Sequence, residues 1–315
     1  MITDRIDQVT LVGNRALEAP PAPISVKIEL TGRCNYRCGF CALRTRQEQP
    51  KGDMDFALFQ RITKEMREAG VEEIGCFYLG ESFTAPDLLI KAIRWCKQDL
   101  QFPYVFLTTN GSLATPNRLR AVMSAGLDSL KFSMNAADDK QFEEVMGVKP
   151  KLLNQALFNL KAARIVREEL GSSCGIYASS IKYDGEQQAK MQDFLNEHVI
   201  PFVDQHYWLP LMSLSGVARE REAELGYKPT AGNQGRLDML RDPLPCWAVM
   251  TEGHVTADGI LSACCMDADG RFGMGDLNKT SFMDAWNSEA FKALRRAHIK
   301  KDVTGTVCEK CIIYA

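Results

Sequence analysis

Three cysteines near the start of the chain constrain its fold more than any other feature. Cys34, Cys38 and Cys41 have C-x₃-C-x₂-C spacing and directly follow the apolar run 24–30, which predicts a β-strand. Thiolates this close together are typical of a metal ion or an iron–sulfur cluster. The next cysteine, Cys76, is far away in the sequence. The local site therefore has three protein ligands and leaves one position open, as catalytic metal sites do.

The spacing by itself leaves three interpretations open. A cluster of four irons held by three cysteines has one iron free to bind a chelating substrate or cofactor. A zinc ion held by the same cysteines would need a distant fourth ligand. The third interpretation is three cysteines brought together by chance.

Composition narrows the class of protein. The chain has 315 residues, 45% of them hydrophobic, which suits one large domain or two. Its 38 basic and 40 acidic residues give a net charge of −2, which argues against nucleic-acid and membrane partners. No apolar run is long enough to span a membrane, and the N-terminus lacks a secretory signal. Eleven cysteines in such a chain favour metal ligation in a reducing cytoplasm over disulfides.

Strand and helix patterns alternate after the cysteine motif. Strands are predicted at 24–30, 73–79, 104–110, 129–135, 173–183 and 202–211, and helices at 55–70, 86–98, 115–126, 139–146, 151–169 and 186–198. Strands separated by helices pair in parallel with right-handed crossovers. Six such units are fewer than the eight of a closed barrel. We therefore expect an α/β fold with an open partial (β/α)₆ barrel.

The chain divides into four predicted parts. Residues 1–24 form a short, irregular N-terminal extension, and residues 25–213 form the barrel. Residues 214–245 are a charged, turn-rich linker with one helical piece, and residues 246–315 are a second, small domain. The stretch before the cysteine motif is too short for an independent peptide-binding domain.

The second domain carries its own cysteine set. Asp258-Gly259 between two short apolar runs predicts a β-hairpin, and 281–298 predicts a helix. The candidate ligands are Cys246, Cys264, Cys308 and Cys311. Four thiolates can close a four-iron cluster or bind zinc tetrahedrally, and spacing alone does not separate the two.

The first motif resembles the signature of the radical S-adenosylmethionine (SAM) enzymes. That resemblance implies a [4Fe-4S] cluster on Cys34, Cys38 and Cys41, with its open iron chelated by the amino and carboxylate groups of SAM. Electron transfer then splits SAM into a 5′-deoxyadenosyl radical that abstracts hydrogen from a substrate. The family places an aromatic or large apolar residue against the adenine just before the third cysteine, where Phe40 stands. The partial barrel is also the fold of this family.

The C-terminal region resembles the SPASM domain, which holds an auxiliary cluster in many radical SAM enzymes. The pattern C-x₁₂-G-x₄-C runs from Cys246 through Gly259 to Cys264, and the stretch 273–296 resembles the same domain. A full SPASM domain has more cysteines than are present here, so the shorter twitch form is implied. Its single auxiliary [4Fe-4S] cluster would be held by the four cysteines above, with Cys265 as the alternative to Cys264.

Further candidates follow the predicted strands, because open parallel sheets bind ligands at their carboxyl ends. Gly80 and Glu81 partly match the family's G-G-E motif, which binds the amino group of SAM. The SAM-binding candidates are Phe40, Gly80, Glu81, Asn110, Ser133 and Asn135. On the sixth strand we expect Gln205, His206, Tyr207 and Trp208 near the substrate, with His206 as a candidate base or a structural histidine.

The sequence thus predicts a radical SAM enzyme that acts on a small polar metabolite. Its relatives in architecture include aminocyclitol dehydrogenases, which implies an oxidation whose second electron goes to the auxiliary cluster. The resemblance also implies a flavodoxin- or ferredoxin-type electron donor. Three alternatives remain: a redox-neutral decarboxylase, dehydratase or epimerase of a sugar-like substrate; a maturase that modifies a peptide or protein; and a non-enzymatic zinc or iron–sulfur interaction protein.

Overall fold

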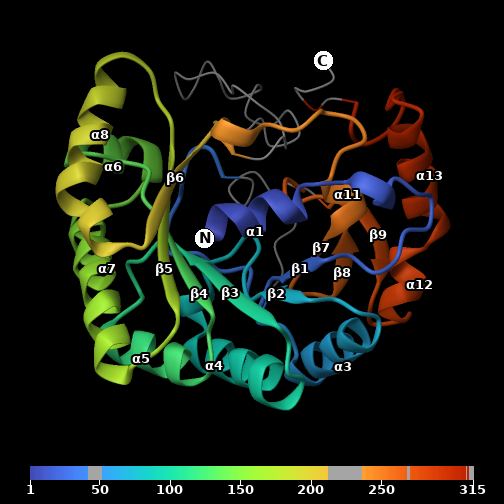
Figure 1. Cartoon of the computed structure of the whole chain (residues 1–315), viewed down its shortest axis with the longest axis horizontal. Helices are drawn as coiled ribbons and strands as arrows, with labels where there is room; N and C mark the ends of the chain where they lie inside the picture. The colour runs from blue at the N-terminus through green and yellow to red at the C-terminus, as the bar shows by residue number, and fades with distance from the viewer. Residues whose placement is uncertain (42–51, 212–235, 268–269, 310, 312–315) are drawn as a thin grey trace.

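A nine-stranded sheet forms the centre of the protein (Figure 1). The structure is a computed structural model, and it describes residues 1–41, 52–211, 236–267, 270–309 and 311. The strand order is β6-β5-β4-β3-β2-β1-β7-β8-β9. The first six strands pair in parallel, and they are β1 (Ser25–Ile28), β2 (Glu73–Gly75), β3 (Tyr104–Thr109), β4 (Ser129–Ser133), β5 (Gly175–Ile181) and β6 (Gln205–Leu209).

Helices that connect these strands cover the outer face of the sheet (Figure 1). They are α3 (Phe56–Glu68), α4 (Pro86–Arg94), α5 (Pro116–Ser124), α6 (Asp139–Met146), α7 (Lys151–Leu170) and α8 (Gly185–His198). Short helical turns lie at η1 (Gly13–Arg15), η2 (Ser82–Thr84), η3 (Trp95–Asp99), η4 (Ile200–Phe202) and η6 (Leu237–Met239). The prediction of a partial (β/α)₆ barrel is confirmed. Among the described residues, no helix is long and apolar enough to cross a membrane.

The two faces of the parallel strands differ in polarity. Side chains that point to the helices are fully buried and apolar, as Ile28, Leu107 and Phe132 show. Parallel strands are usually apolar on both faces, but here the inner face carries polar residues such as Lys27 and Lys131. Because side chains alternate along a strand, the sequence places these cations inside the barrel.

The C-terminal region extends the barrel sheet. Strand β7 (Glu252–Val255) pairs in parallel with β1, and β8 (Ile260–Ser262) and β9 (Gly273–Asp276) continue it antiparallel. The predicted hairpin is confirmed, with Gly259 at a left-handed φ of +87° in its turn. The predicted domain boundaries stay a prediction, since one sheet runs through both parts.

The prediction of one helix over 281–298 is wrong. Two helices occupy this stretch, α12 (Phe282–Trp286) and α13 (Glu289–Ile299). Ser288 separates them, because its hydroxyl caps α13 by accepting from the Phe291 N–H and also donates to the Met274 carbonyl. A short helix, α11 (Ala248–Thr251), leads into β7.

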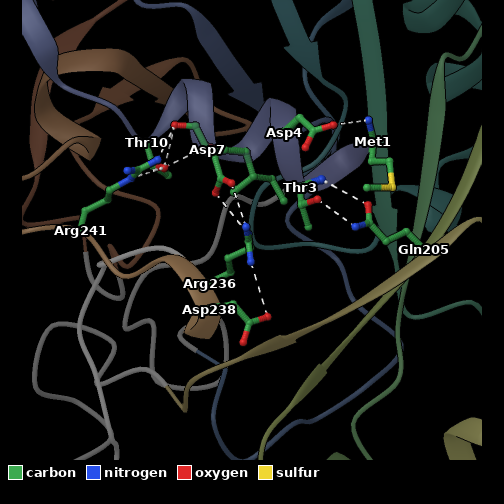
Figure 2. Close-up of polar contacts among 10 residues, drawn as sticks. Met1, Thr3, Asp4, Asp7, Thr10, Gln205, Arg236, Asp238 and Arg241 are labelled. Carbon is green, nitrogen blue, oxygen red and sulfur yellow. Dashed lines mark hydrogen bonds and ion pairs between the residues drawn. The ribbon is translucent and has the colours of Figure 1, made fainter.

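We expected an irregular N-terminal extension, and this is wrong: residues Ile2–Val9 form helix α1. Its apolar residues recur with helical spacing, and α1 lies across the inner side of the barrel (Figure 1). Figure 2 shows how polar contacts tie it to distant segments. Thr3 bonds to Gln205 of β6, and Asp7 pairs with Arg236 at 2.8 Å. The predicted linker lies outside the described residues over 214–235.

An ion pair connects β1 to β7 inside the barrel. Lys27 Nζ lies 2.7 Å from the Glu252 carboxylate, whose side chain is 4% exposed. Removing one partner of a buried pair leaves the other charge uncompensated, which costs about 3–5 kcal/mol. We therefore expect Glu252→Gln to lower the free energy of unfolding by this amount, measured by urea denaturation at neutral pH.

The matched control is Glu143→Gln, because Glu143 pairs with Lys149 on the surface and such pairs contribute little. Burial alone would raise the pKa of Glu252, but Lys27 and His254 outweigh it and lower this pKa from 4.5 to about 2. Its stabilising effect is complete above pH 4.5 and is lost as the pH falls through about 2. The difference in the free energy of unfolding between wild type and Glu252→Gln should become smaller as the pH falls over this range. Equal free energies at neutral pH would contradict the account.

Candidate functional site

The first cysteine set lies in a loop that follows the carboxyl end of β1. Helix α6 anchors this loop, because the Arg37 N–H donates to the Met146 carbonyl at 3.0 Å and the Gly39 N–H donates to Val145 at 2.8 Å. Gly147 ends α6 in a left-handed conformation with its Cα against the Arg37 backbone. The loop therefore has a fixed backbone path although it contains no regular structure.

The turn after β2 packs directly on the start of the cysteine loop. A Cβ atom on Gly80 would lie 1.9 Å from the Thr31 carbonyl oxygen and 3.0 Å from that of Arg33. The Glu81 N–H donates to the Arg33 carbonyl at 2.8 Å. Only glycine allows this approach, so Gly80 positions the loop through its backbone.

The predicted SAM-binding residues Glu81 and Asn110 both join this network. The buried Glu81 carboxylate accepts from the Asn110 N–H at 2.8 Å, from Thr109 Oγ1 at 2.9 Å and from the Phe83 N–H at 3.2 Å. Burial raises the pKa of Glu81, and these donors partly offset the rise. The Asn110 amide donates to Asn35 inside the cysteine loop at 2.9 Å. The ends of β2 and β3 thus hold the loop together.

The other predicted SAM-binding residues lie around the same end of the barrel. Ser133 ends β4 and is half-buried. Asn135 accepts from the Ile181 N–H through its side chain and from the Tyr183 hydroxyl through its carbonyl, which joins the ends of β4 and β5. Phe40 is half-buried against the core. Contact of these residues with SAM stays a prediction.

The donor set in the loop fits an iron–sulfur cluster with one open position. Cys34, Cys38 and Cys41 are each partly exposed. Burial raises the pKa of Cys34 to about 12, so its thiolate needs a compensating cation such as a bound metal. Within the described residues, no three His, Cys, Asp or Glu side chains converge on a single metal ion. A four-iron cluster instead takes each thiolate on a different iron.

The hairpin brings part of the second cysteine set together. Strand β8 runs antiparallel to β7, so Cys264 after β8 lies near the amino end of β7, where Cys246 precedes α11. The Cys265 hydrogen bond and burial raise the pKa of Cys264, and the Cys246 thiol adds to the rise. Burial, Cys246 and Cys311 likewise raise the pKa of Cys308. The four predicted ligands therefore share one electrostatic environment.

A cavity of about 200 Å³, here called the lumenal cavity, lies inside the barrel beneath α1. Apolar walls come from α1 and from aromatic side chains such as Phe106. The lining reaches from Cys265, next to the second cysteine set, to Thr108 near the carboxyl end of β3. That end of the sheet also carries the first set, but none of the described residues of the cysteine loop lines the cavity.

The sixth strand supplies Tyr207 to this cavity and turns His206 away from it. The His206 ring lies 3.0 Å from Ser180 Oγ and packs against Trp208. Adjacent strand residues point to opposite faces, so the predicted base lies on the outer face of the sheet. Burial lowers the pKa of His206 to about 4. The structure does not bring His206 to the lumenal cavity.

Comparisons with known proteins agree with this arrangement. A family model for the radical SAM superfamily matches residues 28–172, and a model for an iron–sulfur cluster-binding domain, SPASM, matches residues 246–312. The chain belongs to the radical SAM superfamily. Its cofactors are SAM, a [4Fe-4S] cluster in the radical SAM domain and auxiliary iron–sulfur clusters in the SPASM region.

The curated relatives are similar to this chain over only part of their own length. A PqqA peptide cyclase from Methylobacterium nodulans is 33% identical over 129 residues, which cover 41% of this chain and 33% of the relative. An S-adenosylmethionine-dependent nucleotide dehydratase RSAD2 from Oncorhynchus mykiss is 35% identical over 115 residues, which cover 35% of this chain and 32% of the relative. The matched part is thus about a third of each relative.

Solved structures with the same fold cover nearly all of the chain. BtrN in complex with AdoMet and 2-DOIA has a TM-score of 0.59 at 16% identity, and covers 92% of both chains. Streptococcus suis SuiB bound to its precursor peptide SuiA has a TM-score of 0.64 at 17% identity, and covers 96% of this chain and 72% of SuiB. At these identities the likeness shows the fold.

Several residues of the site were missed by sequence reasoning. Lys27 and Lys131 occupy inward positions of strands that were predicted, so strand alternation alone could have found them. Glu252 and His254 occur in a predicted apolar run and face Lys27 only because β7 pairs with β1. No sequence signal indicates that pairing.

We expect Gly80→Ala to displace the cysteine loop, because the new methyl group would overlap the Thr31 carbonyl. Iron content after anaerobic reconstitution should fall from about eight to about four per chain. Gly52→Ala is the control, since no atom lies within 4 Å of its added methyl group. Full iron content and normal SAM cleavage in Gly80→Ala would contradict this role.

Proposed function

We propose that this radical SAM enzyme abstracts hydrogen from a small polar metabolite in the lumenal cavity and oxidises it. The observation that carries the proposal is the position of that cavity. Its wall includes Cys265, whose neighbour Cys264 belongs to the second cysteine set. A substrate there would lie next to a fully ligated cluster, which suits electron transfer because no iron is open.

We assign the clusters to the cysteines that the sequence analysis selected. Cys34, Cys38 and Cys41 hold the first cluster, and Cys246, Cys264, Cys308 and Cys311 hold the second. Cys264 is preferred to Cys265, because Cys265 lines the cavity. A flavodoxin- or ferredoxin-type protein is the proposed electron donor.

When bound, SAM and the two clusters supply a 5′-deoxyadenosyl radical and an acceptor for the second electron. The chain supplies placement and exclusion of water. Gly80, Glu81 and Asn110 hold the cysteine loop in position. Helix α1 and aromatic side chains line the cavity and keep water from part of a bound substrate's surface.

The volume of the lumenal cavity favours a small substrate. The lumenal cavity holds about 200 Å³, and α1 is fastened on both sides of it by Gln205 and Arg236. Small-molecule sites are concave and largely preformed in this way.

The second candidate is modification of a peptide. The similarity to PqqA peptide cyclase and the shared fold with SuiB bound to SuiA favour it. Dehydration is a further outcome of the same radical, as the relative named nucleotide dehydratase suggests. The small volume of the lumenal cavity and its position next to the second cysteine set are the reasons to place oxidation of a small metabolite first.

A deuterium-transfer experiment separates these candidates. A fully deuterated cell extract is divided into a small-metabolite fraction and a peptide fraction, and each is incubated with enzyme, SAM and dithionite. We expect 5′-deoxyadenosine to gain deuterium from the metabolite fraction, and the donor to become two hydrogens lighter. Deuterium taken only from peptides would overturn the proposal. A donor that keeps its oxidation state would refute the oxidation.

Cys38→Ala should abolish dithionite-dependent SAM cleavage, because it removes one ligand of the first cluster. The second cluster should remain. Cys96→Ala is the matched control, since Cys96 is buried in the apolar core. Substantial 5′-deoxyadenosine from Cys38→Ala, measured by liquid chromatography, would disprove the assignment.

A further inference from the structure

The lumenal cavity contains an uncompensated positive charge. Four cationic side chains line it, and three are paired with carboxylates: Arg5 with Glu73, Lys27 with Glu252 and Arg236 with Asp7. The fourth is Lys131 on β4. Among the described residues it has no carboxylate partner, and its ammonium donates to the Tyr207 hydroxyl at 3.3 Å.

Lys131 and Tyr207 together present two donors to the cavity. The Tyr207 oxygen accepts from Lys131, so its own proton is available to a ligand. Tyr207 is 6% exposed, and Lys131 is half-buried. A cation in such a site loses hydration without gaining a counter-ion. An anionic ligand would restore the balance by accepting one hydrogen bond on each of two oxygens.

We propose that Lys131 and Tyr207 bind a carboxylate or phosphate group of the substrate. This inference rests on the proposed function and narrows its substrate class to small anions. Much of the remaining lining is apolar and its other cations are paired, so the anionic group would fix the orientation of the substrate. Lys131 is then a specificity-determining residue.

The deuterated metabolite fraction tests this inference after separation by anion exchange. We expect the deuterium donor in the retained, anionic fraction. Pretreatment with phosphatase should abolish the donor if its anion is a phosphate monoester, and should leave it intact if the anion is a carboxylate. An unretained donor overturns the inference but leaves the proposed function standing. Absence of a donor from all metabolite fractions defeats the proposed function itself.

Variants then identify the residue. Lys131→Met should raise the KM for the active fraction on the order of tenfold or more, since it removes a charge-assisted hydrogen bond. Lys131→Arg should have a KM close to that of wild type. Lys190→Met, which changes an exposed lysine, should leave the KM unchanged. An unaltered KM in Lys131→Met would also overturn the inference.

A separate observation concerns the second cysteine set. His298 on α13 is fully buried, and its Nδ1 accepts from the Cys246 N–H at 3.2 Å. A nitrogen that accepts carries no proton, so the neutral imidazole holds its proton on Nε2. Nε2 lies 3.4 Å from Cys308 Sγ. The hydrogen bond network therefore fixes the tautomer that can donate to this sulfur.

We propose that His298 is a positioning residue that donates a hydrogen bond to Cys308 and raises the reduction potential of the auxiliary cluster. Hydrogen bonds to ligand sulfurs are among the factors that set such potentials. The inference rests on Cys308 as a ligand, which Cys308→Ala tests separately through loss of auxiliary iron. A higher potential would make the cluster a better acceptor of the substrate's second electron.

The potential is measured by redox titration in a background that lacks the first cluster, with Cys34, Cys38 and Cys41 all changed to Ala. His298→Leu should make the potential more negative, and His298→Gln should stay near wild type because its amide can both accept and donate. A second measurement does not depend on the variant's keeping its iron. In protein that retains His298 and is labelled with ¹⁵N-histidine, the reduced cluster should show hyperfine coupling to an imidazole nitrogen. An unchanged potential, or no such coupling, would overturn the proposal.

Discussion

The parallel pairing of β1 with β7 is the constraint on which the rest of the structure depends. It joins the C-terminal hairpin to the barrel sheet, although more than two hundred residues separate the strands. The first cysteine set follows β1, and the second set surrounds the hairpin. Their relative position is therefore set by backbone hydrogen bonds, with Lys27 and Glu252 adding a buried ion pair across the same strands.

Polarity inside the barrel follows from strand alternation. Each parallel strand gives its apolar side chains to the helices and some polar ones to the lumen, where Lys27 and Lys131 lie. These charges would be costly in a filled core. Helix α1 covers the space they line and supplies Arg5 and Asp7 as counter-charges for barrel and linker residues. The result is a partly charged cavity inside the barrel whose lining reaches Cys265, next to the second cysteine set.

Local patterns predicted most of the fold. The six strand–helix units and the hairpin have clear periodicity and turn signals, so they were predictable to within a few residues. Residues 281–298 were predicted as one helix, although Ser288 caps α13 through a local bond from the Phe291 N–H. Its second bond, to the Met274 carbonyl, depends on the fold. Helix α1 was missed although its apolar residues recur with helical spacing. Its contacts with distant residues such as Gln205 depend on the fold.

The candidate site was predictable where spacing carries the chemistry. The cysteines and the Gly80-Glu81 turn have fixed local patterns. The structure explains why residue 80 is glycine, because a side chain there would overlap the Thr31 carbonyl. Lys131, Glu252 and His298 act through residues far apart in the sequence, so only the fold reveals their partners. His206 was predicted near the substrate because it lies on β6. Its ring instead bonds to Ser180 on the outer face of the sheet, away from the lumenal cavity.

The most direct test of the two-cluster account is the iron and sulfide content of anaerobically reconstituted protein. Wild type is compared with a variant in which Cys34, Cys38 and Cys41 are all changed to Ala. The account predicts about eight irons per chain in wild type and about four in the variant. A variant without iron but with stoichiometric zinc would contradict it, because the C-terminal cysteines would then form a structural site that cannot accept an electron.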